Sequence, residues 1–441
     1  MKPQISKEEQ KMKKLFVLLA AVICAAVYAA TIDIVAAENR DYKTGEEITF
    51  KVTAYESKDK LMDAGTFTLK ITDSGLNAIP VKADLSKGNP FTFKTKLNRP
   101  GFVFVKPTDC TMPDGKVVKW ANTRELPAAG GAAVEPEKIR QAGSVPEDFH
   151  KFWADGLKAF EKAEVAVVRA PELDYPGYKV SRITVTFPDK SGFIDGFLSI
   201  PVKKGKYPII AGVPGAGPGV VKPVPYICNF KPSIRLFMNI FPFRTAATAK
   251  EQTARYNEWT KTLPEGKPYY HVYSENRDKF IYRNAFLALS RAVDFVASLP
   301  EFDGKNIAAS GNSQGGGTAL ALGYLNKKIT CVAASVPALC DHDGVLLKRV
   351  PGWPRLNLGM PNKKHTALPY FDGATFASFI KVPTIISVGY VDDTCYPASI
   401  YAAYNNLKGE KKIVTLPRAG HRNSAESRKI LGEFIDSVFA R

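Results

Sequence analysis

A serine between two glycines is the first candidate for chemistry in this sequence. Residues 311–315, GNSQG, match the pattern G-x-S-x-G, in which the glycines permit a sharp turn that leaves the serine hydroxyl accessible. An apolar run precedes this turn and helix-forming residues follow it, which predicts a strand leading into a helix. Because so short a pattern arises by chance in long chains, Ser313 predicts catalysis only if suitable partners occur elsewhere.

A base is the first partner needed, because a serine hydroxyl is a poor nucleophile until its proton is removed. Imidazole has a suitable pKa near neutrality, and the chain contains five histidines. His421 follows the apolar run KKIVTLP and a flexible Arg-Ala-Gly segment, where a loop at the carboxyl end of a strand would present it. Of the other four, His150 precedes the predicted sheet, and His271 and His365 lie in irregular segments. His342 lies beside Asp341 and Asp343 and fits a solvated or weakly metal-binding group. These four are predicted to be non-catalytic: His150, His271, His342 and His365.

An acid is the second partner, because the other imidazole N–H needs an acceptor that fixes the tautomer of the ring. The run VPTIISVGYVDDTCYP predicts an apolar strand followed directly by Asp392 and Asp393. The resulting order of serine, aspartate and histidine is one of those known for catalytic triads. Spacing alone does not choose between the two aspartates.

An acyl-transfer site also needs backbone N–H groups that stabilise the oxyanion of the tetrahedral intermediate. The N–H of Gln314, the residue after the serine, would supply one of them. The glycine-rich segment GVPGAGPG at residues 212–219 follows another apolar run and is the best source of the second. It lacks the Lys-Ser/Thr pair of a phosphate-binding loop, so we do not interpret it as one.

The elements that would hold these residues follow from the hydrophobic pattern after residue 149, where short apolar runs alternate with amphipathic helices. Strands are predicted at 207–213, 307–310, 329–335, 382–389 and 412–416, and helices at 280–299, from 314, at 396–407 and at 424–439. This alternation predicts a mostly parallel sheet covered by helices on both faces. Functional loops of such sheets lie at the carboxyl ends of the strands.

The chain before residue 126 has a different pattern. Apolar and polar residues alternate with period two in short runs broken by Gly, Asn, Pro and Asp, which is typical of half-buried antiparallel strands. We therefore predict a small immunoglobulin-like β-sandwich at 31–125. Residues 126–145 are rich in Ala, Gly and Pro and are predicted to link it to a second domain at 146–441. The sandwich contains no candidate catalytic cluster, so a packing module is the preferred interpretation over a binding one.

Residues 1–30 are predicted to be a signal peptide. Three lysines precede the apolar run LFVLLAAVICAAVYAA, which ends in small residues suited to cleavage. An uncleaved membrane anchor is the alternative, but the run is shorter than the ~20 residues that span a bilayer. The predicted location is therefore secreted or periplasmic, with no stable membrane span after cleavage.

Composition limits the partners. The net charge of +18 favours anionic surfaces, but no basic run is interleaved with aromatic residues, and an exported chain is not expected to bind nucleic acid. The 45% of apolar and 24% of charged residues are typical of a globular protein. Five cysteines remain after the signal, an odd number at irregular spacing, so neither a disulfide scaffold nor a metal site is indicated. No metal or organic cofactor is expected.

From about residue 146 onward the sequence resembles the acetyl xylan esterase/cephalosporin-C deacetylase family, carbohydrate esterase family 7 of the α/β hydrolases. The stretches that carry the resemblance are PEDFHKFW, SGNSQGGGTALAL, LPYFDGATFA and SVGYVDDTCYPASIYAAYNNL. The resemblance implies an α/β-hydrolase fold with the nucleophile at Ser313, the base at His421 and the acid at Asp392. It also implies Val213 as the second oxyanion donor, because Pro214 has no N–H.

The sequence departs from the family pattern near the predicted pocket. FPFRTAA around Arg244 stands where the family usually carries Arg-Gly-Gln, Arg422 follows the base in place of Glu, and Val213 replaces a Tyr. The resemblance implies a secreted serine esterase that removes acetyl or other short acyl groups from an acylated sugar or oligosaccharide. The alternatives are a related peptidase or amidase and a non-catalytic carbohydrate-binding protein. The acyl chain length and the oligomeric state are left open.

Overall fold

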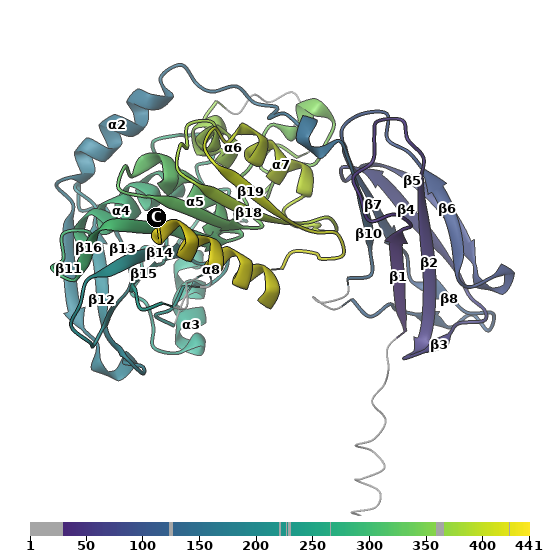
Figure 1. Ribbon diagram of the computed structural model, residues 1–441, viewed down its shortest axis with the longest axis horizontal. Helices are drawn as coiled ribbons and strands as arrows, with labels where there is room; N and C mark the ends of the chain where they lie inside the picture. Colours follow the sequence, from purple (N-terminus) through teal and green to yellow (C-terminus); the bar gives the residue numbers. More distant parts are fainter. Residues whose placement is uncertain are drawn as a thin grey trace, which may run out of the picture.

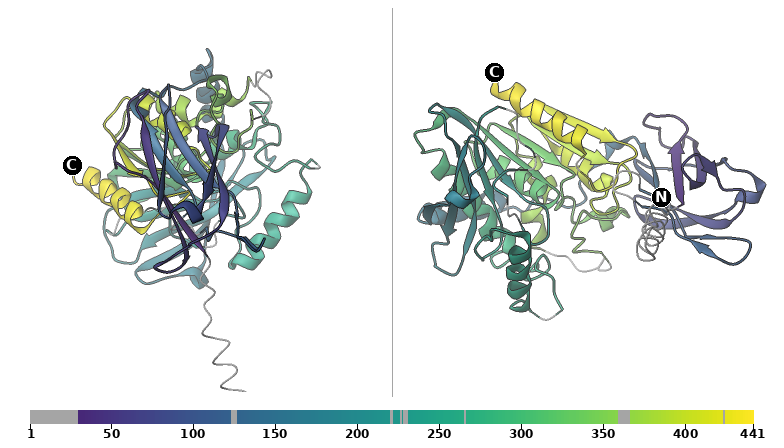
Figure 2. Two further views of the ribbon diagram at one scale, coloured as in Figure 1. Left: turned by 90° about the vertical axis from the view of Figure 1, so that its right-hand side faces the viewer. Right: turned by 90° about the horizontal axis from the view of Figure 1, so that it is seen from below.

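The computed structural model describes residues 30–441 except 123–126, 220–221, 226, 228–230, 265, 359–365 and 423. An all-β unit precedes residue 135, and a larger α/β unit follows it and lies beside it (Figures 1 and 2). Apart from Ala30, the predicted signal peptide lies outside the described residues. Within the described part of the chain, no helix is long and apolar enough to cross a membrane.

The all-β unit consists of two sheets that share one hydrophobic core. One sheet contains β1 (Thr31–Ala36), β2 (Ile48–Ser57), β3 (Lys60–Leu61) and β6 (Phe91–Thr95). The other contains β4 (Thr66–Asp73), β5 (Leu76–Asp84), β7 (Gly101–Pro107), β8 (Cys110–Thr111), β9 (Val117–Val118) and β10 (Gly130–Val134). The predicted antiparallel strands are present, and alternate side chains such as Phe50 and Leu69 fill the core between the sheets.

The segment predicted as a linker, 126–145, is not only a connection. Its residues 130–134 form strand β10, which pairs antiparallel with β7 and extends the second sheet. The small residues of this segment, on which the prediction of a linker rested, permit close packing. A Cβ on Gly131 would lie 2.7 Å from the carbonyl oxygen of Tyr390 in the α/β unit, so a larger residue would displace the strand.

The α/β unit is built on a sheet whose nine strands, within the described residues, lie in the order β11-β12-β13-β15-β14-β16-β17-β18-β19. Their bounds are Glu164–Arg169, Tyr178–Thr186, Phe193–Pro201, Ile234–Met238, Tyr207–Val213, Phe302–Asn312, Cys331–Ser335, Thr384–Gly389 and Lys411–Leu416. The strands from β15 to β19 in this order are parallel, as predicted for β14 and β16 to β19, whereas β15 itself was not predicted. The first three strands, β11 to β13, were not predicted and are antiparallel.

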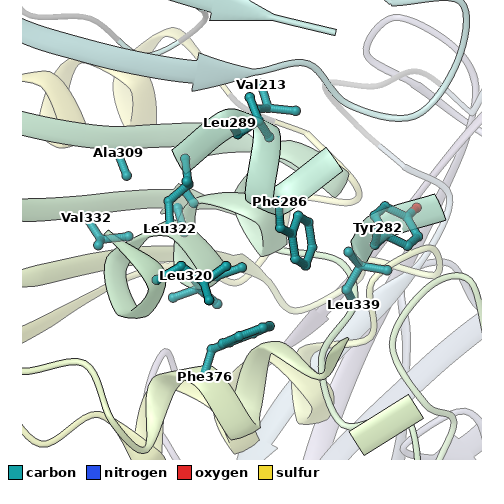
Figure 3. Packing of buried hydrophobic residues seen from close by; sticks show 14 of the residues in the cluster. Val213, Tyr282, Phe286, Leu289, Ala309, Leu320, Leu322, Val332, Leu339 and Phe376 are labelled. Carbon is teal, nitrogen blue, oxygen red and sulfur yellow. The ribbon is translucent and has the colours of Figure 1, made fainter. Parts of the chain in front are cut away.

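Helices cover both faces of this sheet (Figure 1). They are α2 (Phe149–Phe160), α3 (Ala249–Lys261), α4 (Ile281–Val296), α5 (Gln314–Leu325), α6 (Gly373–Ala377), α7 (Pro397–Asn406) and α8 (Ala425–Phe439). Short 3-10 helices lie at Leu85–Lys87, Pro136–Lys138, Pro171–Leu173, Gly344–Leu347 and Leu368–Phe371. Alternate strand residues face opposite layers: Ala308 packs toward α8, whereas Ala309 packs in the core with Phe286 of α4 and Leu320 of α5 (Figure 3).

Strands β7 and β10 form the face of the all-β unit that packs on the α/β unit (Figure 1). In β7, Val103 points into the core of the all-β unit, and Phe102 points the other way. The Phe102 ring is 1% exposed and lies 5.1 Å, between centroids, from Tyr390 at the end of β18. Arg99 donates to the carbonyl oxygens of Leu347 and Lys348 at 2.6 Å each. The two units are therefore joined by a packed, hydrogen-bonded interface.

Candidate active site

Ser313 occupies the sharp turn between β16 and α5. Its φ and ψ of 58° and −119° are strained for a residue with a side chain, as expected at a nucleophile turn. Its backbone N–H donates to the carbonyl oxygen of Ser335 at 2.9 Å, and its carbonyl oxygen accepts from Ala338 N–H at 2.9 Å. These bonds tie the turn to the segment after β17 and hold the strained conformation in place.

The glycines on either side of the serine are required by close contacts within the turn. A Cβ on Gly311 would lie 2.2 Å from the carbonyl oxygen of Gly315. A Cβ on Gly315 would lie 2.0 Å from the carbonyl oxygen of Val213 at the end of β14. Neither position has room for a methyl group, which explains both glycines of the motif in physical terms.

The structure brings the three predicted triad residues together from loops that follow three different strands. The Oγ of Ser313 lies 2.9 Å from Nε2 of His421, after β19. The Nδ1 of the same ring lies 2.8 Å from Oδ2 of Asp392, after β18. This is a continuous hydrogen-bonded line from hydroxyl to imidazole to carboxylate, the arrangement that activates a serine.

Contacts around the two downstream loops fix the acid and the base relative to each other. The N–H of Val391 donates to the carbonyl oxygen of Ala419 at 3.2 Å, which joins the loop before the base to the loop of the acid. The Oδ1 of Asp392 accepts N–H groups of Thr394 and Cys395, both at 2.8 Å. Asp392 is fully buried, so its carboxylate is held by three hydrogen-bonding partners, the N–H groups of Thr394 and Cys395 and the Nδ1 of His421, rather than by solvent.

The choice between the two aspartates is resolved by these contacts. Asp393, the rival, forms an ion pair with Lys106 of the all-β unit, with 3.2 Å between Oδ2 and Nζ. Within the described residues, Asp392 is the aspartate of the pair that hydrogen-bonds to His421.

His421 is held in an environment that favours its protonated form. Burial of the ring opposes protonation, but the hydrogen bond with Asp392 and the neighbouring Cys395 outweigh burial, and the pKa of His421 is raised to about 10. The same bond would stabilise the imidazolium that forms when the base accepts a proton. The geometry therefore supports proton transfer from Ser313 through this ring.

The raised pKa predicts an alkaline pH optimum. A general base must be neutral, so ester hydrolysis should increase as pH rises through the pKa of His421 in the free enzyme. We expect the acidic limb of kcat/KM for an aryl acetate to lie above 6.5, the ordinary value for histidine. A pH profile between 5 and 10.5, corrected for spontaneous hydrolysis, checks this. An acidic limb at or below 6.5 would contradict it.

The two predicted oxyanion donors, Gln314 and Val213, both lie next to the turn that holds Ser313. Gln314 begins α5, so its backbone N–H is unused by the helix and is available beside Ser313. Val213 is the last residue of β14, pairs with Gly311 in the sheet and is buried. Gly215, two residues on, lines the pocket, and a Cβ on it would lie 3.7 Å from Cβ of Ser313. The N–H of Gly215 is therefore a further candidate for the second donor, beside that of Val213.

The side chain of Gln314 has a role that the sequence did not predict. Its Oε1 accepts the hydroxyls of Tyr269 at 2.5 Å and Tyr282 at 2.8 Å. Burial raises the pKa of both phenols, so both remain neutral donors across the physiological pH range. The two tyrosines thus fix the first residue of α5 and with it the N–H beside the nucleophile.

Ser313 and His421 open into a pocket of about 740 Å³ at the boundary between the two units. The α/β unit contributes Trp353 and Asp393 to its lining. The all-β unit contributes further lining residues, which the sequence did not indicate: Phe104, Lys106, Asn122, Pro127, Ala128 and Ala129. One signal could have suggested this: the run FVFVK at 102–106 is apolar on both faces, which indicates a strand packed on both sides.

The other singled-out residues lie elsewhere. His150, His271 and His342 are not among the described residues that line the pocket, and His365 lies outside the described residues. The expectation of a solvated His342 is wrong, since it is 1% exposed. Arg244 forms a 3.1 Å ion pair with the fully buried Asp195, so it has a structural partner. The four described cysteines are free and buried.

The chain is similar to known acetyl esterases. A family model described as acetyl xylan esterase (AXE1) matches residues 135–431. The chain is 28% identical over 403 residues to acetyl esterase Axe7A of Xylanibacter ruminicola, and the alignment covers 88% of this chain and 85% of that protein.

Solved structures share the fold of the α/β unit. Acetyl xylan esterase 1 from Thermoanaerobacterium sp. JW/SL YS485 is similar with a TM-score of 0.55 at 19% identity. An acetyl xylan esterase from Paenibacillus sp. R4 has a TM-score of 0.55 at 20% identity. Each similarity covers 69% of this chain and 98% of the other. The predicted α/β-hydrolase fold is confirmed.

Proposed function

Since the chain belongs to the acetyl xylan esterase family and is a carboxylic ester hydrolase, we propose that it is a secreted serine esterase that removes acetyl or other short acyl groups from carbohydrate. The observation that carries this proposal is the hydrogen-bonded line from Ser313 through His421 to Asp392 beside an open pocket. Secretion rests on the signal sequence at 1–30, and an immunoglobulin-like fold of the all-β unit remains part of the proposal.

Acylation begins when Oγ of Ser313 attacks the ester carbonyl carbon and Nε2 of His421 accepts the hydroxyl proton. Asp392 accepts the Nδ1–H and stabilises the imidazolium. The oxyanion of the tetrahedral intermediate is bound by the N–H of Gln314 and by that of Val213 or Gly215. His421 then protonates the leaving sugar oxygen, the C–O ester bond breaks, and the acyl group remains on Ser313.

Deacylation repeats these steps with water as the nucleophile. His421 accepts a proton from water, the resulting hydroxide attacks the acyl carbon, and the intermediate collapses with release of the carboxylate. The proton returns to Oγ of Ser313, which restores the free enzyme. The chain's own residues supply every proton transfer in this cycle.

Acetylated carbohydrate is the substrate class that we propose, because the matched family and relatives are acetyl and acetyl xylan esterases. The pocket supports it, since its lining combines an aromatic ring, that of Trp353, with polar groups from Asn312, Asp393 and Thr394. Such a mixture suits the apolar faces and hydroxyl edges of sugars.

Acetate release tests this proposal against its alternatives. The purified protein should release acetate from acetylated xylo-oligosaccharides and from p-nitrophenyl acetate, and should cleave aminoacyl p-nitroanilides at least about 100-fold less efficiently in kcat/KM. Faster cleavage of the anilides would favour a peptidase or amidase. Binding of the oligosaccharide without hydrolysis of any ester would favour the non-catalytic carbohydrate-binding protein.

A further inference from the structure

We propose that the N-terminal all-β unit is part of the substrate-binding site, where Phe104, Lys106 and Asn122 bind a neutral, hydroxyl-rich oligosaccharide next to the ester under attack. This inference rests on the proposed function and extends it. It changes the interpretation of the unit from a packing module to a specificity-determining wall of the pocket.

The first observation is that one wall of the pocket comes from the all-β unit. Phe104 and Lys106 lie on β7, and Asn122 follows β9, yet all three line the same pocket as Ser313 and His421. The family match begins only at residue 135, after these positions. The α/β unit alone would leave this side of the pocket open.

The second observation is that this wall is fixed against the loop of the catalytic acid. Alternate residues of β7 contact that loop: Phe104 packs on Tyr396 with 6.1 Å between ring centroids, and Lys106 pairs with Asp393. On the opposite edge, Asp41 accepts the hydroxyl of Tyr390 at 3.2 Å. A wall held at several points can position a substrate without first having to become ordered.

The third observation is the size of the pocket. The acetyl ester group would fill only a small part of the pocket, whose volume is about 740 Å³. The remaining space lies between the catalytic loops and the all-β unit, where the sugar units attached to the ester would extend. Ligand pockets of several hundred cubic ångströms usually bury most of the surface of the bound ligand. Contacts from the all-β unit should therefore contribute to recognition of the sugar.

The chemistry of the lining indicates a neutral ligand. Apart from His421, Lys106 and Asp393 are the charged residues among the described lining residues, and they compensate each other across 3.2 Å. Both are about half exposed, at 52% and 50%, so each keeps hydrogen-bonding capacity toward the pocket. Sugar hydroxyls can donate to the carboxylate and accept from the ammonium.

An aromatic ring of the α/β unit and a side-chain amide of the all-β unit complete the lining of the pocket. Trp353 lines the pocket and packs on Tyr270 with 4.6 Å between ring centroids, which fixes the indole as a platform for a sugar face. The Oδ1 of Asn122 accepts the N–H of Ala128 at 3.3 Å, which orients the side-chain amide. Asn122 can then donate from its NH₂ group to a sugar hydroxyl.

Two substrates of different length test the inference in the full-length protein. We compare kcat/KM on acetylated xylo-oligosaccharides with kcat/KM on p-nitrophenyl acetate for Lys106→Ala and Asn122→Ala. Loss of a hydrogen bond to a charged or oriented group should lower the oligosaccharide value by about tenfold or more relative to the aryl acetate value. The matched control is Lys94→Ala, on β6 in the other sheet, where the lysine forms an exposed pair with Glu47. Its ratio should equal that of the wild type.

A binding measurement separates this inference from the proposed function. In a Ser313→Ala background, titration with the same oligosaccharides should give a Kd at least about fivefold weaker when Lys106→Ala or Asn122→Ala is added. An unchanged Kd and an unchanged substrate ratio for both variants would overturn the inference while leaving the esterase intact. Absence of any ester hydrolysis by the wild type would instead overturn the proposed function.

Discussion

Replacing Ser313 by alanine is expected to lower kcat for p-nitrophenyl acetate by about 10⁴-fold to 10⁶-fold, because the substitution removes the atom that attacks the ester. The hydroxyl makes its hydrogen bond to Nε2 of His421, and the backbone of the turn is held by separate bonds to Ser335 and Ala338. The fold should therefore remain intact. Steady-state kinetics with a circular dichroism spectrum and a thermal melt measure both effects.

The matched control for this change is Ser310→Ala. Ser310 lies in the same strand, is 2% exposed, and its hydroxyl donates to the carbonyl oxygen of Ile227 at 3.0 Å. Its removal should cost about 1–2 kcal/mol of stability but leave kcat within about threefold of the wild type. Retention of more than about one-hundredth of the wild-type kcat by folded Ser313→Ala would contradict a serine nucleophile at this position.

Replacing Asp392 by asparagine should have the second-largest effect, a decrease in kcat of about 10³-fold to 10⁴-fold. The carboxylate accepts the Nδ1–H of His421 at 2.8 Å and would stabilise the imidazolium during proton transfer. An amide at this position can present an NH₂ group to Nδ1, which would favour the wrong tautomer. The pKa of His421 should also fall, so the acidic limb of the remaining activity should move to lower pH.

Asp393→Asn is the matched control for Asp392→Asn, because it makes the same substitution at the neighbouring residue. Its carboxylate pairs with Lys106 rather than with the imidazole, so at least about one-tenth of kcat on the aryl acetate should remain and the pH profile should keep its limb. Equal losses in the two variants would contradict the assignment of the acid. Kinetics at saturating substrate over a range of pH distinguish these outcomes.

The hydrogen-bonded arrangement of Ser313, His421 and Asp392 could be predicted from sequence because its parts follow strong local signals. Ser313 directly follows β16, Asp392 and His421 lie in the loops after β18 and β19, and parallel strands bring such positions to one edge of the sheet. The helices on either side have amphipathic or apolar patterns, so their observed bounds lie within a few residues of the predicted ones. Spacing could not distinguish Asp392 from Asp393, because that choice depends on contacts between loops far apart in the chain.

Other elements were missed where a residue's role depends on distant neighbours. Strand β10 has small residues because Gly131 packs against Tyr390, and the same composition is typical of a linker. The bounds of β14 likewise decide which N–H groups of the segment 212–219 lie near Ser313; the strand ends at Val213, and a Cβ on Gly215 would lie 3.7 Å from Cβ of Ser313. Local patterns contain no information on either contact.

The contribution of the all-β unit to the pocket was missed for a related reason. When only the contacts inside the all-β unit are considered, one face of β7 is predicted to be buried and the other exposed. Its second apolar face, which includes Phe102 and Phe104, is explained by the tyrosines of the α/β unit, nearly 300 residues later in the chain. Apolarity on both faces was present in the sequence and indicates that such a strand is covered twice.

The most direct test of a serine esterase mechanism is to identify the residue that an active-site probe modifies. Folded protein is treated with a fluorophosphonate, and the adduct is located by mass spectrometry of the intact chain and of its peptides. We predict one adduct per chain, on Ser313, that forms much more slowly in Asp392→Asn and is absent in Ser313→Ala. A folded wild-type protein that remains unmodified, or that carries the adduct on another residue, would contradict the account.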